Sequence, residues 1–200
     1  NISILNCAVV LNNAENYGGG GGLRSVNSAP VIKNCTFAHN TAYQGGAIRA
    51  GYSSASSPFV EHCILWGNSP NEIYNDGSSE TIVIYSDIQG GYTGDGVINA
   101  DPLFVVSSQG DYYLSQLNSG QPNNSPCLNA GSAYASDICY TTIDETTCMN
   151  HVTTGYYPDS GMVDLGVHYK QPLGPPVPSL SGIGVVLLVL LFGGVFVKLK

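Results

Sequence analysis

Short apolar runs alternate with turn-forming residues along the first hundred positions of the chain. Each run holds three to six apolar residues and ends at Asn, Gly or Pro, which is the length of a strand rather than a helix. Several runs place a Cys, a variable residue and then Val, Phe or Leu in order, which is the two-residue alternation of a strand with one buried face. The pattern predicts an all-β fold of short strands joined by tight turns.

The runs recur with a period of 28 residues, which is followed by a shorter step of 23 to a fourth copy at residues 85–91. Two columns of identical residues keep the same register through the first three copies. They are Cys7, Cys35 and Cys63, and Asn12, Asn40 and Asn68. A repeat of this length is typical of one turn of a three-sided parallel solenoid. We expect the asparagines to occupy a corner, because Asn tolerates the left-handed conformation and its amides can form a ladder along the stack.

Glycines precede the next apolar segment in the first two copies. Residues 18–22 are all glycine and lead into Leu23, and residues 45–48 read GGAI. Glycine here allows a positive φ and a close approach of neighbouring coils. A flexible linker is the alternative for residues 18–22, but the matching second copy favours the repeat.

The second copy resembles a known repeat family. FAHN at residues 37–40, together with GGAI at 45–48, resembles the FxxN and GGA[I/L/V] motifs of polymorphic outer-membrane β-helix proteins. The resemblance covers residues 1–100 and implies a surface-exposed, right-handed, pectate-lyase-like parallel β-helix, with little information on activity. Because the chain opens within a repeat, without a signal peptide, we expect an export signal and earlier coils upstream.

Residues 101–170 carry a second series of motifs: DPLFV at 101–105, GDYYL at 110–114, SPCLNAG at 125–131 and DSGMVDLGVHY at 159–169. These blocks resemble the closing module of secreted β-helix proteins with interchangeable C-terminal anchors, often called choice-of-anchor domains. Residues 137–154 depart from that pattern as an insertion. We expect residues 101–170 to form an irregular cap, because an uncovered last coil would be an exposed edge.

Six cysteines in an exported protein first suggest disulfides. The repeated cysteine column is explained by small buried side chains, which favours free thiols, although adjacent coils lie close enough for a bridge. Cys139 and Cys148 are the best disulfide candidates, because they close a small loop in the insertion. No CxxC spacing or histidine cluster accompanies the thiols, so the sequence predicts neither a metal site nor a cofactor.

The C-terminal tail has an extended spacer at residues 171–179 and an uncharged segment that ends at Lys198 and Lys200. We expect residues 180–200 to form a transmembrane or sorting helix with its basic end in the cytoplasm. The tail resembles the IPTL-type sorting signal that exosortase-like membrane peptidases process, with Ile183 where that family usually has Trp. The motif residues are Val177, Pro178, Ser179, Leu180 and Ser181. The resemblance implies contact with the membrane and with such a peptidase, and leaves open whether the tail is cleaved or stays as an anchor.

Composition narrows the class of function. Hydrophobic residues make up 43 % of the chain and charged residues 10 %, which allows a buried core and argues against disorder. The net charge is −8, and because two of the six basic residues lie at the C-terminus, residues 1–177 carry −10. Such a chain repels nucleic acid, so we expect no nucleic-acid partner.

Candidate catalytic residues are few. A lyase would need a base among Arg24, Lys33 and Arg49, beside acidic groups that hold a cation. The acidic candidates are Asp76, Asp87, Asp95 and Asp101, each beside Gly, Ser or Pro, where turn formation explains it. His39 and His62 fall at different repeat positions. The sequence therefore predicts no catalytic residue in this fragment.

Thirteen tyrosines provide the strongest indication of binding. Tyr43, Tyr52, Tyr74, Tyr85 and Tyr92 could form a shallow face for sugar rings, or else fill the core and cover turns. We expect an exported bacterial protein at the cell surface with a structural, adhesive or glycan-contacting role. The main alternative is the C-terminal part of a polysaccharide lyase or glycoside hydrolase with its active site upstream. A third possibility is polymer assembly through the open first coil.

Overall fold

The computed structural model describes residues 2–15, 19–107, 110–141, 146–148 and 161–169. Within these residues the chain is all-β, and most strand pairs are parallel. Two short 3-10 turns, Leu117–Ser119 and Ala135–Asp137, are the helical elements of the described part. The expectation of an all-β chain is confirmed.

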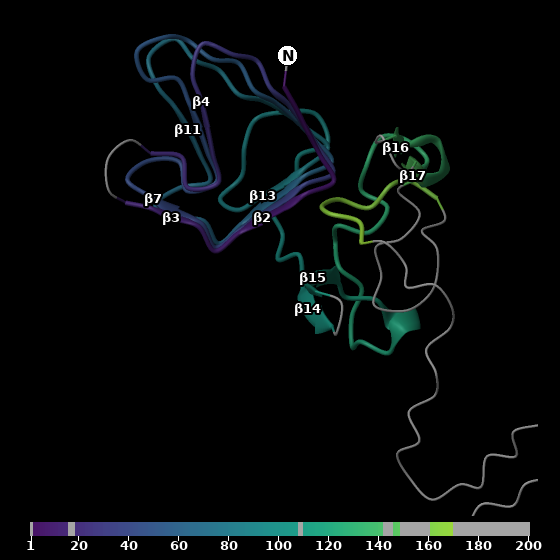
Figure 1. Ribbon diagram of the computed structural model, residues 1–200. Coiled ribbons are helices and arrows are strands. Elements are labelled where there is room, and N and C mark those ends of the chain that lie inside the picture. Colours follow the sequence, from purple (N-terminus) through teal and green to yellow (C-terminus); the bar gives the residue numbers. More distant parts are fainter. Residues whose placement is uncertain (1, 16–18, 108–109, 142–145, 149–160, 170–200) are drawn as a thin grey trace, which may run out of the picture.

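Three parallel sheets hold the N-terminal half together, and each takes its strands from successive repeats (Figure 1). The first sheet contains β1 (Ser3–Leu5), β5 (Val31–Lys33), β9 (Phe59–Glu61) and β12 (Ile82–Ile84). The second contains β2 (Ala8–Val10), β6 (Thr36–Ala38), β10 (Ile64–Trp66) and β13 (Asp87–Ile88). The third contains β4 (Leu23–Ser25), β8 (Ile48–Ala50) and β11 (Ile73–Asn75). A short parallel pair, β3 (Asn13–Ala14) and β7 (Thr41–Ala42), extends the second sheet beyond its corner.

The pairing register follows the spacing of the sequence repeat. Ser3 pairs with Val31, 28 residues later, and Phe59 pairs with Ile82, 23 residues later. In the third sheet the step is 25, from Leu23 to Ile48. The first repeat has a longer connection before its third-sheet strand, and the second repeat has a longer one after it, so the 28-residue register returns at the next strand.

Two columns of left-handed residues bound the second sheet, with φ between +41° and +83°. They are Asn6, Asn34, His62 and Tyr85 before the sheet, and Leu11, His39, Gly67 and Gly90 after it. The second column corrects the sequence interpretation, because the left-handed residue is the one before each repeated asparagine. The asparagines contribute through their side chains instead.

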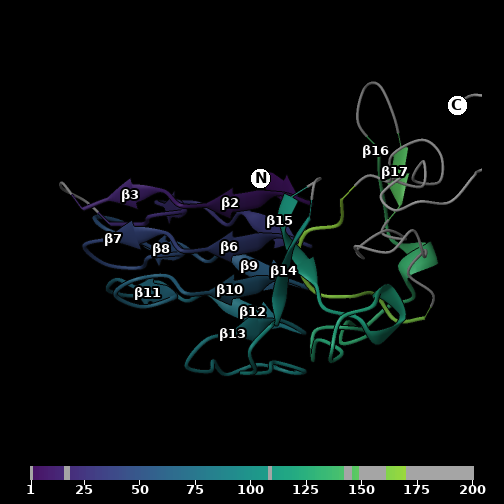
Figure 2. The same cartoon turned by 90° about the horizontal axis from the view of Figure 1, so that it is seen from below.

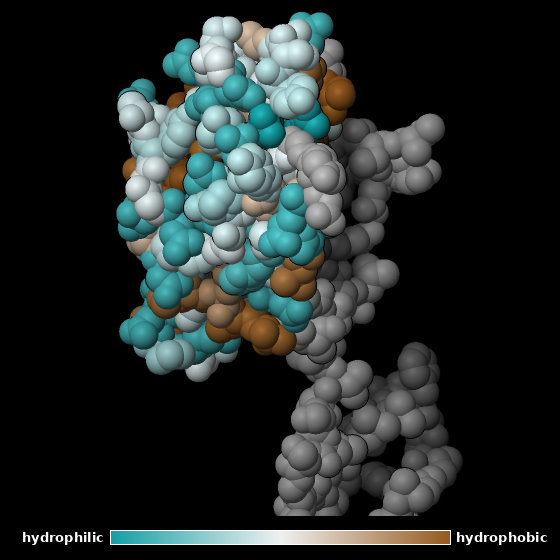
Figure 3. All heavy atoms as spheres, turned by 90° about the vertical axis from the view of Figure 1, so that its left-hand side faces the viewer, coloured by the Kyte–Doolittle hydropathy of each residue, from teal (hydrophilic) through white to brown (hydrophobic). Residues whose placement is uncertain are grey.

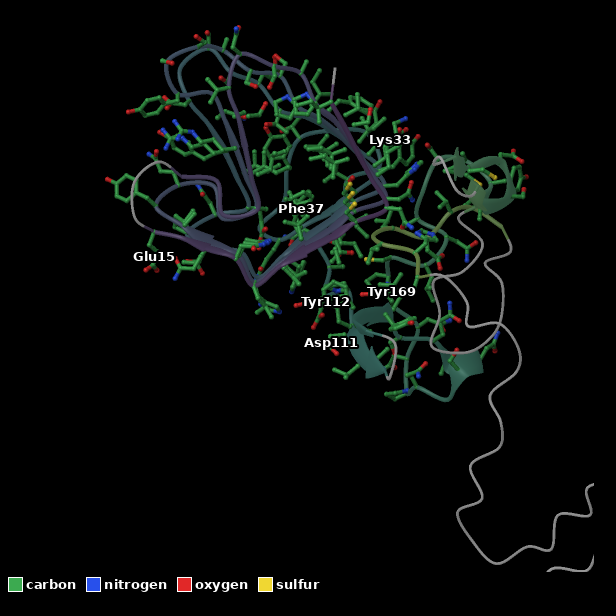
Figure 4. All side chains as sticks on the ribbon, viewed as in Figure 1. Glu15, Lys33, Phe37, Asp111, Tyr112 and Tyr169 are labelled. Atoms are coloured by element: carbon green, nitrogen blue, oxygen red, sulfur yellow. The ribbon has the colours of Figure 1, made fainter. Side chains whose placement is uncertain are left out.

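The space between the three sheets is filled by inward-facing apolar side chains. Ile32, Phe37, Ile48 and Leu65 are fully buried there, and Figure 4 shows Phe37 pointing into the enclosed interior. Burying a side chain of this size contributes about 1.5–3 kcal/mol. Tyr92 packs against the last layer at the fourth repeat and helps to cover that end of the core.

The C-terminal segment does not form the predicted lid over the last coil. It packs against the outer side of the second sheet, where Ile64, Leu114, Cys127 and Leu165 form a second core. Figure 2 shows β14 (Phe104–Ser107) and β15 (Gly110–Leu114) running across the levels of the stacked strands. The physical reason is that the outer side of this sheet is apolar and needs cover.

Backbone and side-chain hydrogen bonds join the C-terminal segment to all four repeats. His168 exchanges two bonds with Asn6, and the Val167 N–H donates to Thr36 Oγ1 at 3.0 Å. The remaining contacts are Gly166 N–H with the His62 carbonyl and Cys127 Sγ with Asp87 Oδ2. The segment therefore clasps the side of the stack along its length.

The insertion forms an antiparallel pair, β16 (Cys139–Thr141) and β17 (Thr146–Cys148), with Cys139 opposite Cys148. No helix among the described residues has the length and apolar character to cross a bilayer. The spacer at 171–179, the sorting motif at 177–181 and the expected helix at 180–200 lie outside the described residues.

Candidate functional site

The outer side of the third sheet carries a column of large polar and aromatic residues. Alternation in β4, β8 and β11 buries the first residue of each strand and turns the second outward. The register places Arg24 beside Arg49 and Arg49 beside Tyr74. Two of the three basic residues of the repeats are therefore neighbours on adjacent strands.

Tyr52, from the loop after β8, packs on both arginines. Its ring centroid lies 4.5 Å from Arg24 Cζ and 5.2 Å from Arg49 Cζ, and Arg49 Cζ lies 5.7 Å from the centroid of Tyr74. Guanidinium groups at such distances are attracted by the negative face of the ring. Tyr52 remains 63 % exposed, so the ring presents a flat surface to solvent.

The two arginines differ in environment. The Arg49 side chain is 6 % exposed, and its Nη2 lies 2.8 Å from Asp76 Oδ2. Gly19 makes this burial possible, because a Cβ at that position would lie 2.6 Å from Arg49 Cδ. Arg24 is exposed, and within the described part of the chain it has neither an ion pair nor a hydrogen bond.

Figure 3 shows this side of the molecule as mainly hydrophilic, with hydrophobic residues in separate patches. A guanidinium stays protonated at neutral pH, so neither arginine serves as a proton acceptor. A charged fork beside a flat aromatic ring is suited to binding rather than to acid–base chemistry. We call Arg24, Arg49, Tyr52, Tyr74 and Asp76 the third-sheet site.

The structure divides the five tyrosines named from the sequence. Tyr52 and Tyr74 belong to the third-sheet site, while Tyr43 is 71 % exposed in the loop before the second glycine pair. Tyr85 lies at a corner with its ring 6.4 Å from that of His62. Tyr92 packs on the core, and its hydroxyl donates to the Thr81 carbonyl. A single continuous aromatic face does not form from these five.

The acidic candidates are also separated. Asp76 pairs with Arg49, and Asp101 Oδ1 accepts from the Leu103 N–H in a local turn. Asp95 accepts through its backbone carbonyl from the Tyr85 N–H. Asp87 is fully buried below the C-terminal segment. No set of three His, Cys, Asp or Glu side chains in the described part of the chain is arranged to hold a metal ion.

The repeated asparagines form a chain of hydrogen bonds along the stack. Asn12 Nδ2 donates to Asn40 Oδ1 at 2.8 Å, and Asn40 Nδ2 donates to Asn68 Oδ1 at 2.8 Å. The Asn68 backbone N–H and side-chain amide then donate to the two carboxylate oxygens of Glu72. Glu72 takes the place that a further asparagine would have in the fourth repeat, where the sequence has Gly91.

Sequence reasoning missed two buried carboxyls. Burial raises the pKa of Glu72 to about 7, against the opposing effect of its bonds from Asn68. Burial likewise raises the pKa of Asp87 to about 6, although the Ala100 N–H and the Cys127 thiol donate to it. The available signal was the break in the asparagine column at position 91, which leaves Asn68 in need of another acceptor.

The repeated cysteines have free thiols in a column of their own. The backbone N–H of Cys7 lies 3.4 Å from Cys35 Sγ, and that of Cys35 lies 3.4 Å from Cys63 Sγ. Cys139 is disulfide-bonded. The side chain of Cys148 lies outside the described side chains, so the predicted pair with Cys139 stays a prediction.

The two histidines of the repeats lie apart, as their different repeat positions predict. His62 is buried, and its Nε2 accepts from the Ser132 N–H at 3.1 Å, with Ser132 Oγ at 2.9 Å. Burial lowers the pKa of His62. Because a backbone N–H already occupies the accepting nitrogen, this pair ties the C-terminal segment to the stack rather than activating the hydroxyl.

No protein-family model matches the chain, and no match was found among curated proteins or solved structures. The function proposed below therefore rests on the repeat pattern, the resemblances of its motifs and the geometry of the third-sheet site.

Proposed function

We propose that this chain is part of an exported surface protein, built on a right-handed parallel β-helix whose outer side contacts carbohydrate. The observation that carries the binding role is the third-sheet site, where two arginines hold a largely exposed tyrosine ring in a fixed position. Flat, exposed aromatic rings on rigid strands provide contact area at low entropic cost. The site supports binding without turnover.

The β-helix is supported by two independent features. Strand pairs follow the 28- and 23-residue steps of the sequence repeat, and each of the three sheets takes its strands in repeat order. The motifs at residues 37–40 and 45–48 resemble those of outer-membrane β-helix repeats. In this proposal residues 1–100 are the coils, and residues 101–170 are a module that covers one side of them.

Export and surface location are supported by the tail. Residues 171–179 are a proline-rich spacer, and residues 180–200 combine an apolar segment with terminal lysines. In this proposal an exosortase-like peptidase or the membrane itself holds the C-terminus, and the coils face outward toward an extracellular polysaccharide.

Affinity electrophoresis of the full chain in gels that contain neutral or acidic polysaccharides tests the binding role. We expect retardation in at least one polymer, and a loss of about tenfold in affinity on Tyr52→Ala, because the exposed ring is the main contact surface. Tyr134→Ala is the matched control, since Tyr134 is 61 % exposed on the C-terminal segment. Migration unaffected by every polymer, or equal losses in both variants, would contradict the proposal.

A further inference from the structure

Building on the proposed function, we infer that the third-sheet site binds an acidic carbohydrate, with Arg24 holding the carboxylate of a uronic acid while the sugar ring lies against Tyr52. The inference names the ligand class of the same site. It depends on the unequal pairing of the basic residues of the repeats.

Three basic residues project from the stacked strands, and two of them are neutralised. Lys33 Nζ lies 2.6 Å from Glu61 Oε2, and Arg49 Nη2 lies 2.8 Å from Asp76 Oδ2. Arg24 has no such carboxylate among the described residues, although it is the neighbour of Arg49 on the next strand. Its positive charge is thus left for an external anion, in a chain whose net charge is −8.

The position of the Arg24 side chain is prepared for such an anion. Stacking on Tyr52 at 4.5 Å orients the guanidinium, while the side chain remains exposed. A planar fork of N–H donors matches the two oxygens of a carboxylate, and a fixed side chain loses less entropy on binding. A neighbouring guanidinium, that of Arg49, adds a second positive charge to the same surface.

The exposed ring of Tyr52 supplies the second half of the site. The C–H face of a pyranose ring packs favourably on an aromatic ring, as apolar surfaces do. A small anion uses the arginine alone, and a neutral sugar uses the tyrosine alone. A uronic acid within a polysaccharide uses both groups together, which is the reason for preferring this ligand class.

The test compares polymers that differ in charge and proteins that differ in one side chain. Alginate, hyaluronan and xanthan are each paired with the same polymer after reduction of its carboxylates to alcohols. Affinity of the full chain is measured for all six, with wild type, Arg24→Gln and Lys33→Gln. The two variants remove the same charge from different sheets, and circular dichroism checks that both remain folded.

We expect at least one acidic polymer to bind about tenfold more tightly than its reduced form, a preference that Arg24→Gln abolishes and Lys33→Gln retains. Equal binding of acidic and reduced polymers, sensitive to Tyr52→Ala but not to Arg24→Gln, would overturn the ligand class and leave the carbohydrate role standing. Absence of binding to all six, together with no retardation in the wider neutral set, would overturn both.

Discussion

At the residue scale, the buried asparagines satisfy backbone groups that the corner of a parallel stack leaves unpaired. Asn40 Nδ2 donates to the Val9 carbonyl of the preceding repeat, and its Oδ1 accepts from the N–H and the amide of Asn12. Asn40 is fully buried, so each of these groups would be dehydrated without a partner if the amide were removed. One side chain thus connects three successive repeats.

Asn40→Ala should lower the free energy of unfolding by about 3 kcal/mol, because it leaves several buried polar groups without partners. Urea denaturation followed by circular dichroism measures this loss. Asn118→Ala, at an exposed position, should change stability by less than about 0.5 kcal/mol. A loss as small for Asn40→Ala as for Asn118→Ala would show that the amide chain contributes little.

Glu72 predicts a dependence of stability on pH. Its pKa rises from 4.5 in the unfolded chain to about 7 in the folded one, so the folded state binds the proton more tightly. The resulting stability is fully present below about pH 4.5 and is lost as the pH rises through 7, a change of about 3 kcal/mol at most. Asp87, with its pKa raised to about 6, acts in the same direction.

Urea midpoints at pH 5 and pH 8 should therefore show lower stability at pH 8. Glu72→Gln should reduce this difference by about half, because the amide does not titrate and only Asp87 remains. Glu80→Gln removes the same charge at an exposed position and should leave the difference unchanged. A pH dependence that survives Glu72→Gln intact would assign the effect to other groups.

At the scale of the element, the glycine run at residues 19–22 is a paired segment and not a linker. Its backbone N–H groups donate to carbonyls of residues 44–46, from Gly20 to Gln44 through Gly22 to Gly46. The backbone passes so close to the core that a Cβ on Gly22 would lie 2.6 Å from Phe37 Cδ1. Glycine at this position is required by packing on the next repeat.

Gly22→Ala should destabilise the fold by about 2 kcal/mol, because the added methyl overlaps a fully buried phenylalanine. Gly77→Ala is the comparison, since Gly77 has φ +61° and open space around the position of a Cβ. That variant carries backbone strain alone, at about 1 kcal/mol. If both variants lost the same amount, by thermal or urea unfolding, close packing against Phe37 would not be the cause.

At the scale of the whole molecule, the C-terminal segment and the repeats share a buried interface. Leu165 is fully buried against Ile64 and Leu114, and Trp66 packs at the margin of the same cluster. Since hydrogen bonds from this segment reach the first through the fourth repeat, we expect the two parts to unfold together.

Leu165→Ala should lower stability by about 2–5 kcal/mol through the cavity that it leaves. Trp66 is the single tryptophan of the chain, so its fluorescence reports on the interface while circular dichroism reports on the sheets. The two transitions should coincide in wild type and shift together in the variant. Leu117→Ala, at a residue 57 % exposed, should shift neither, and separate transitions would show independent unfolding.

Contacts one repeat apart were determined by the sequence itself. The period and the alternation of inward and outward residues predict the strands, the cysteine column and the asparagine column, because stacked copies place equivalent residues side by side. The same reasoning missed Glu72, since its role depends on the absence of an asparagine in the shortened fourth repeat rather than on a repeated residue.

Contacts between non-equivalent positions were decided by the tertiary structure. Arg24, Tyr52 and Asp76 meet because loops of different length bring them to one side of the third sheet, which the 28-residue period does not encode. His168 reaches Asn6 across 162 residues because the apolar outer side of the second sheet needs cover. Periodic spacing carries information about neighbours in the stack, whereas such long-range packing depends on which surfaces remain uncovered once the stack has formed.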